Sequence, residues 1–206
     1  MPEWSKGLVL STNVVIRLGS NPSPDTNHIL LIIIIIYYIK MNTGDLIFFK
    51  KYNGWWILGK LISWWTQSPF IHVGIILKDP KFLGLKGTYI WQSEPLGGVT
   101  ITHFKSHRKF WIRKYIGTPL DSDKLEEIFK ITNGKPYDKN PFDWIEVIIG
   151  KDFIPQRTNA FWCSALVGCI LTKLGIFNKN ADWDLMSPGY LSNVDLDCYA
   201  TLTNHS

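Results

Sequence analysis

Five segments with the β-branched and aromatic residues typical of strands follow one another along the chain, and segments with helical patterns come after them. The expected strands are residues 45–50, 71–77, 88–94, 99–103 and 110–115, and the expected helices are residues 121–134, 142–149 and 159–175. Gly134 and Gly175 are placed to end the first and third helices. This order, with strands first and helices after, is typical of an α+β domain.

The composition supports a folded chain with one main domain. Of the 206 residues, 46% are hydrophobic and 19% are charged, which supplies enough apolar material for a core. The net charge is +5, but the basic residues are spread along the chain except in residues 105–114. We interpret that cluster as a solvated strand face with Trp111 and Ile112 turned inward, so no nucleic-acid partner is expected.

The first forty residues differ from the rest. A segment rich in Ser, Asn and Pro is followed by an uninterrupted apolar run of eleven residues, 29–39. This run is shorter than the roughly 20 residues that a helix needs to cross a bilayer core, and neither a basic segment nor a cleavage motif flanks it. We predict an N-terminal extension over residues 1–40, disordered or anchored at a membrane and dispensable for folding, and one domain over residues 41–206.

Three cysteines, Cys163, Cys169 and Cys198, include no Cys-x-x-Cys pair and leave an odd thiol. This pattern argues against a disulfide framework and favours a cytoplasmic location, at a membrane or free of it. Cys163 falls in the opening turn of the third expected helix, where free N–H groups and the helix dipole favour an anion. Because the thiolate is the reactive form, we expect a lowered pKa for this thiol, with a buried, inert cysteine as the alternative.

His72 lies in an expected strand whose other residues are almost all apolar, so its imidazole is expected in a dry setting. A histidine on a rigid strand can serve as the base for a thiol, although a core histidine bonded to a backbone carbonyl explains the same pattern. Glu94, on the next strand, can accept a hydrogen bond from the second ring nitrogen and fix the tautomer. Gln92 shares that strand face and competes for the role, for which Glu94 is preferred.

Four short blocks occur in a fixed order along the chain: Gly44–Phe48, Ile71–Ile75, Gly134–Asp138 and Phe161–Ser164. Together they resemble the permuted NlpC-type proteins, a group that includes YiiX-like bacterial proteins, relatives of lecithin retinol acyltransferase and uncharacterised poxvirus proteins. The resemblance implies a permuted papain-like fold, in which a small antiparallel sheet or partial barrel packs against helices and the nucleophile lies at a helix N-terminus. It also implies that Cys163 is the nucleophile, His72 its base and Glu94 the third polar residue. Tyr137 resembles a family tyrosine near the site, as an orienter or a donor to an oxyanion.

A cysteine–histidine pair is typical of acyl transfer through an acyl-enzyme. We therefore expect a thiol-dependent hydrolase or acyltransferase acting on amide, ester or thioester bonds, with a cysteine peptidase or a catalytically silent binding module as alternatives. An apolar stretch rich in tryptophan is suited to a lipid, an acyl chain or a membrane surface, and equally to a core helix. Its tryptophans are Trp55, Trp56, Trp64 and Trp65. No metal-binding or phosphate-binding motif is present, so no metal and no cofactor are expected.

Overall fold

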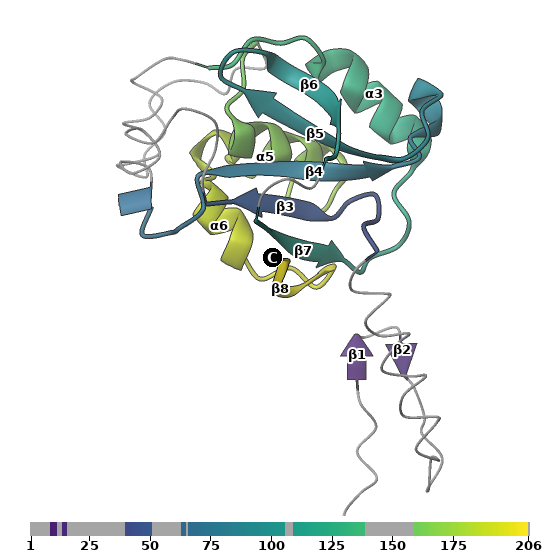
Figure 1. Cartoon of the computed structure of the whole chain (residues 1–206), viewed down its shortest axis with the longest axis vertical. Helices are drawn as coiled ribbons and strands as arrows, with labels where there is room; N and C mark the ends of the chain where they lie inside the picture. The colour runs from purple at the N-terminus through teal and green to yellow at the C-terminus, as the bar shows by residue number, and fades with distance from the viewer. Residues whose placement is uncertain are drawn as a thin grey trace, which may run out of the picture. The chain divides into compact units, whose positions relative to one another are not determined.

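The computed structural model of the chain divides into two units, Met1–Met41 and Asn42–Ser206. The structure describes residues 9–11, 14–15, 40–50, 63–64, 66–105, 109–138 and 159–205. In the first unit, the short strands β1 (Val9–Ser11) and β2 (Val14–Val15) form an antiparallel pair. The second unit contains the main sheet and the helices (Figure 1).

The second unit is built on an antiparallel sheet of six strands in the order β6-β5-β4-β3-β7-β8. Its strands are β3 (Leu46–Phe49), β4 (His72–Lys78), β5 (Thr88–Glu94), β6 (Gly98–His103), β7 (Phe110–Tyr115) and β8 (Tyr199–His205). Most of these strands are rich in β-branched and aromatic residues, which suit a pleated and buried surface. Within the described residues the sheet is open, with β6 and β8 as its edges.

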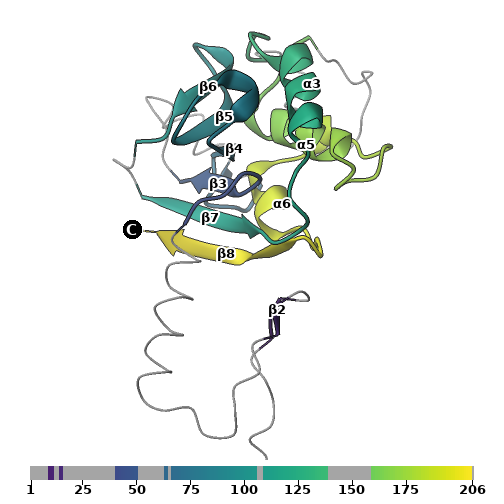
Figure 2. The same cartoon turned by 90° about the vertical axis from the view of Figure 1, so that its right-hand side faces the viewer.

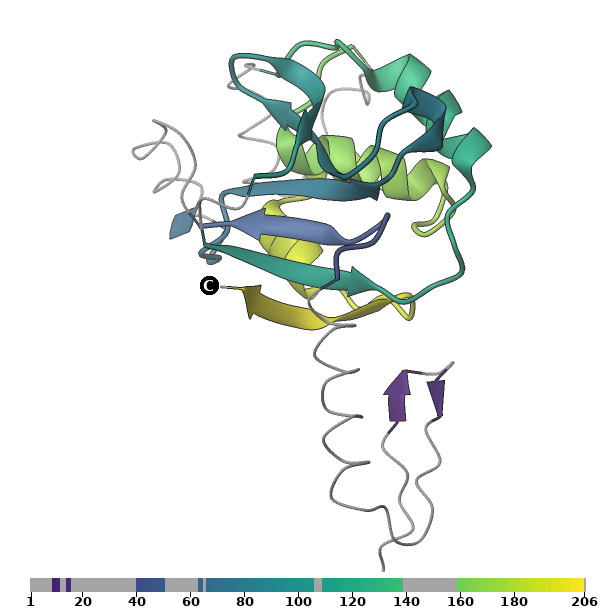
Figure 3. The ribbon, with the colours of Figure 1, turned by 45° about the vertical axis from the view of Figure 1, so that its right-hand side comes forward.

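Three helices lie on one side of this sheet (Figure 2). They are α3 (Ser122–Thr132), α5 (Cys163–Lys173) and α6 (Pro188–Asn193), accompanied by the 3-10 turns η1 (Lys81–Leu83) and η2 (Trp183–Leu185). The Asp121 side chain caps α3 by accepting a hydrogen bond from the N–H of Asp123. α5 packs on β4 and β5 and is buried along most of its length (Figure 3).

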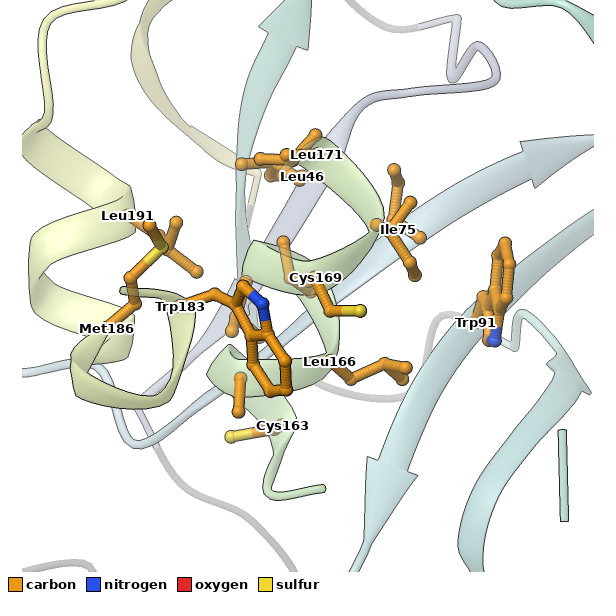
Figure 4. Close-up of a cluster of buried hydrophobic side chains, with 14 of the residues drawn as sticks. Leu46, Ile75, Trp91, Cys163, Leu166, Cys169, Leu171, Trp183, Met186 and Leu191 are labelled. Carbon is orange, nitrogen blue, oxygen red and sulfur yellow. The ribbon is translucent and has the colours of Figure 1, made fainter. Parts of the chain in front are cut away.

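The main core lies between the sheet and α5. Leu46, Ile75 and Trp91 lie directly opposite one another on β3, β4 and β5 and form a row across the sheet. Figure 4 shows this row beside Leu166 and Leu171 of α5, and all five residues are fully buried. Burial of apolar surface on this scale is the main source of stability for such a domain.

The α+β class is confirmed, and the five expected strands and the first and third expected helices are present at nearly the expected positions. The interpretation of the basic cluster needs correction, because Arg113 and Lys114 of β7 are 5% and 1% exposed. β7 lies inside the sheet, between β3 and β8, so its polar side chains find partners within the protein. α6 and β8 are additions to the expected elements, and the helix expected at residues 142–149 lies outside the described residues.

Candidate active site

Cys163 is the first residue of α5, and the residues just before it are held in place by hydrogen bonds. The Ser93 hydroxyl of β5 donates to the carbonyl of Phe161 over 2.5 Å. The N–H of Asp138 donates to the same carbonyl over 3.3 Å, and the N–H of Phe161 donates to the carbonyl of Pro136 over 3.1 Å. The start of α5 is thus fixed to β5 and to the segment that follows α3.

The segment that carries Pro136 is itself docked on β6. The N–H of Val99 donates to the carbonyl of Lys135 over 2.8 Å, and the N–H of Gly134 donates to the carbonyl of Val99 over 3.0 Å. Gly98 has a φ of 66°, and a Cβ at this position would collide with the carbonyl of Lys135. Glycine is therefore required for this close approach, which brings the third and fourth sequence blocks side by side.

The sulfur of Cys163 lies against the beginning of β4. It accepts hydrogen bonds from the backbone N–H groups of Val73, Ser164 and Cys163 itself, and from the Ser164 hydroxyl. The pairing of β4 with β5 begins at Ile75, so Val73 lies beyond the end of that ladder. Cys163 therefore contacts the residue that follows His72 in the sequence.

Burial governs the ionisation of Cys163, which is 6% exposed. Burial raises the pKa of the thiol to about 11, while the hydrogen bonds from Val73, from Ser164 and from its own N–H act in the opposite direction. The expectation of a lowered pKa is therefore wrong, because these donors do not offset the loss of water around the sulfur. At neutral pH the group is a thiol.

His72 is the first residue of β4 and is 3% exposed. Its Nε2 lies 2.9 Å from Oε1 of Gln92. Because an amide oxygen only accepts hydrogen bonds, Nε2 carries the proton and Nδ1 carries the lone pair. Burial lowers the pKa of His72 to about 4, while the hydrogen bond to Gln92 acts in the opposite direction, so the imidazole is neutral at pH 7.

The structure gives this contact to Gln92, the alternative to the expected Glu94. The register of β4 and β5, continued by one residue, places Gly74 opposite Gln92. A Cβ at Gly74 would lie 2.5 Å from Cγ2 of Ile90 and 3.3 Å from Cβ of Gln92. The missing side chain lets the strands approach closely and leaves His72 a diagonal path to Gln92. Glu94 ends β5 and is half-buried.

Tyr137 lies in the segment docked on β6 and is half-buried. Burial raises the pKa of its phenol well above the ordinary value, and the charges of ionised Cys163 and Asp138 add to this effect. Tyr137 is thus close enough to the sulfur of Cys163 for their charges to interact, and it keeps its proton. It is a hydroxyl donor beside the candidate nucleophile.

The remaining candidates lie apart from this arrangement. Trp64 is 73% exposed and precedes β4. Three further tryptophans lie outside the described residues: Trp55, Trp56 and Trp65. Cys169 is buried in α5, and Cys198 is half-buried just before β8. Among the described residues, no group of three or more His, Cys, Asp or Glu is placed to hold a metal ion.

Three residues that support the site were not anticipated from the sequence: Ser93, Ser164 and Thr102. Ser93 fixes the start of α5, Ser164 donates to the sulfur of Cys163, and Thr102 accepts a hydrogen bond from Nε2 of Gln92 over 3.2 Å. Strand alternation places Ser93 on the α5 side of β5, which is a usable signal. The contact of Thr102 depends on the β5–β6 register, which the sequence alone does not specify.

The chain has no match among protein-family models and none among curated proteins. Among solved structures, it is similar to the crystal structure of the metalloprotein yiiX from Escherichia coli O157:H7, a DUF1105 protein. The TM-score is 0.48 and the sequence identity is 21%, over 80% of this chain and 96% of that chain. None of the helices in the described part of the chain has the length and apolar character needed to cross a membrane.

Proposed function

We propose that the chain is a thiol-dependent hydrolase or acyltransferase in which Cys163 is the nucleophile, His72 its base and Gln92 the residue that orients the base. One observation supports this most strongly. The sulfur of Cys163 is hydrogen-bonded to the backbone of Val73, while the imidazole of the preceding residue is hydrogen-bonded through Nε2. A thiol and a neutral, oriented histidine are thus held at neighbouring residues of one strand, which suits acyl transfer.

In the proposed reaction, the proton of the Cys163 thiol moves to Nδ1 of His72 as the sulfur attacks the carbonyl carbon of the substrate. The carbon–sulfur bond forms and the carbonyl electron pair moves to the oxygen. The intermediate then expels an amine, alcohol or thiol, which takes the proton from the imidazolium, and an acyl thioester is left on Cys163. Water or a second acceptor attacks this thioester and restores the thiol.

The resting pair in this reaction is neutral. With the pKa of Cys163 at about 11 and that of His72 at about 4, a preformed thiolate and imidazolium are both disfavoured by burial. Proton transfer therefore accompanies the attack instead of preceding it. For the oxyanion, the proposed donors are the backbone N–H at the start of α5 and the hydroxyl of Tyr137.

An acylation assay tests the proposal. Incubation with p-nitrophenyl acetate should acetylate Cys163 faster than Cys198, although Cys198 is the more exposed of the two. The reason is that exposure alone gives Cys198 no base, whereas His72 accompanies Cys163. Intact-mass spectrometry measures the rate, and peptide mapping locates the acetyl group.

Two variants serve as matched controls in this assay. Cys169→Ala and Cys198→Ala remove a thiol but keep Cys163, so both should be acetylated like the wild type, whereas Cys163→Ala should not. Acetylation that simply follows exposure, with Cys198 modified first and with no effect of His72→Ala, would favour the catalytically silent binding module instead.

Exposed apolar residues near the site favour lipid-linked substrates as a second proposal. Leu96, in the turn between β5 and β6, is 96% exposed, and Trp64 is 73% exposed. Because β4 and β5 are antiparallel, the residues before β4 and the turn after β5 lie at the same end of the sheet as His72 and Gln92. Exposed side chains of this size are suited to an acyl chain or a membrane surface.

Vesicle flotation tests this second proposal. The wild type should float with vesicles that contain anionic phospholipid, and the double variant Trp64→Ser/Leu96→Ser should bind about tenfold more weakly or less, because each side chain buries apolar area at the surface. Leu85→Ser is the matched control, since Leu85 is also exposed but precedes β5 at the opposite end. Absence of flotation by the wild type, or equal losses in both variants, would contradict lipid contact at this end.

A further inference from the structure

The side-chain amide of Gln92 is held between two neighbouring strands. Its Oε1 lies 2.9 Å from Nε2 of His72 on β4, and its own Nε2 donates to Oγ1 of Thr102 on β6 over 3.2 Å. Gln92 is 4% exposed, so the orientation of its amide depends on protein partners more than on water. The three residues form a hydrogen-bonded row across β4, β5 and β6.

A second threonine on β6 makes no such bond. Thr100 lies directly opposite Gln92 in the pairing of β5 and β6, yet in the described part of the chain its buried Oγ1 has no hydrogen-bond partner. Thr102 lies opposite Ile90 and is reached diagonally. Residues two apart on a strand share a face, so the two threonines differ mainly in this one hydrogen bond.

We propose that Thr102 is a positioning residue for the candidate base: it accepts from Nε2 of Gln92, holds Oε1 towards His72 and thereby selects the Nε2–H tautomer of the imidazole. The catalytic consequence rests on the proposed function. The tautomer is a property of the resting protein and can be measured without any substrate.

The orientation of the amide decides which ring nitrogen carries the proton. If the amide of Gln92 turned over, its NH2 group would face Nε2 of His72, which would then have to be an acceptor, and the ring proton would lie on Nδ1. That tautomer has no lone pair on Nδ1 to take the thiol proton. When the imidazolium forms, both nitrogens carry protons, and only an amide with Oε1 turned inward accepts from Nε2.

The tautomer is measured by nitrogen NMR on protein labelled with 15N-histidine at neutral pH. In the wild type, Nε2 of His72 should appear protonated and Nδ1 unprotonated. Thr102→Val keeps the shape of the side chain but removes the acceptor, and should give a mixture of the two tautomers. Thr102→Ser restores a hydroxyl and should restore the single tautomer, and Thr100→Val should leave it unchanged.

A further variant separates positioning from general damage to the fold. Gln92→Glu replaces the amide by a carboxylate, which has no NH2 end, so the double variant Gln92→Glu/Thr102→Val should show the Nε2–H form that Thr102→Val alone loses. In the acylation assay, Thr102→Val should lower the maximal rate about tenfold with little change in KM, which is the effect of about one hydrogen bond.

The outcomes distinguish this inference from the proposed function. A single Nε2–H tautomer in Thr102→Val, the same as in Thr100→Val, would overturn the positioning role. A mixture of tautomers in Thr102→Val that the carboxylate corrects supports the role, even if no variant alters acylation. In that last case the proposed function fails while the hydrogen-bonded row stands.

Discussion

Replacing His72 by alanine is expected to slow the acylation of Cys163 by about 10²- to 10⁴-fold at pH 7, the range that a general base contributes. In the wild type, the neutral imidazole takes the thiol proton as the sulfur attacks, so little free thiolate is needed. In the variant only the thiolate reacts. With the pKa of Cys163 at about 11, the thiolate fraction at pH 7 is about 10⁻⁴.

The pH dependence should separate the two proteins as clearly as the rate. Wild-type acylation should be nearly flat from about pH 5 to 10 and should fall as the pH drops through about 4, where His72 gains a proton and ceases to be a base. The rate of the variant should rise about tenfold for each pH unit over the same range, because the thiolate fraction does. Release of p-nitrophenol, corrected for hydrolysis without protein, measures both profiles.

His103→Ala is the matched control for this prediction. His103 lies on β6, is exposed and packs its ring against Tyr89, so removing it changes a histidine without touching the candidate site. Its rate and pH profile should equal those of the wild type. A flat profile retained by His72→Ala would show that some other group accepts the thiol proton.

Signals that arise between near neighbours allowed much of the fold to be predicted from the sequence. The strands around Ile75 and Ile112 are marked by β-branched and aromatic residues, and the helix that starts after Asp121 is marked by its cap. The same kind of signal places Cys163 at a helix start. β8 gives little signal, because its residues are largely polar and it is held in place by pairing with β7.

Features set by distant contacts were outside the reach of the sequence. The pKa of Cys163 follows from burial by segments that meet only in the folded chain, and local reasoning about the helix dipole gave the wrong direction. Strand alternation places Gln92 and Glu94 on one face, but the choice between them depends on the register and on the space at Gly74. Lys114 appeared to be a solvated residue because its partner Asp45 lies 69 positions away.

Asp45→Asn is expected to lower the free energy of unfolding by about 3–5 kcal/mol, the usual cost of breaking a buried ion pair from one side. Nζ of Lys114 lies 2.9 Å from Oδ2 of Asp45, and the two side chains are 1% and 0% exposed. The same carboxylate accepts from the N–H of Tyr115 over 2.9 Å and from the N–H of Asn42 over 2.8 Å. The substitution leaves a buried ammonium without its counter-charge, and urea unfolding followed by tryptophan fluorescence measures the loss.

Two lysine variants show whether burial is the cause. Lys114→Met should cost less than Asp45→Asn, because the carboxylate keeps its two backbone donors. Lys130→Met removes an ion pair of 2.7 Å with Glu126 on the surface of α3, where the side chains are 68% and 40% exposed, and should change stability by about 0.5 kcal/mol or less. Equal losses in Asp45→Asn and Lys130→Met would contradict this account. Because Asp45 belongs to the first sequence block, a large loss of stability with unchanged acylation by the folded protein would assign that block to the fold and leave the chemistry to the other three.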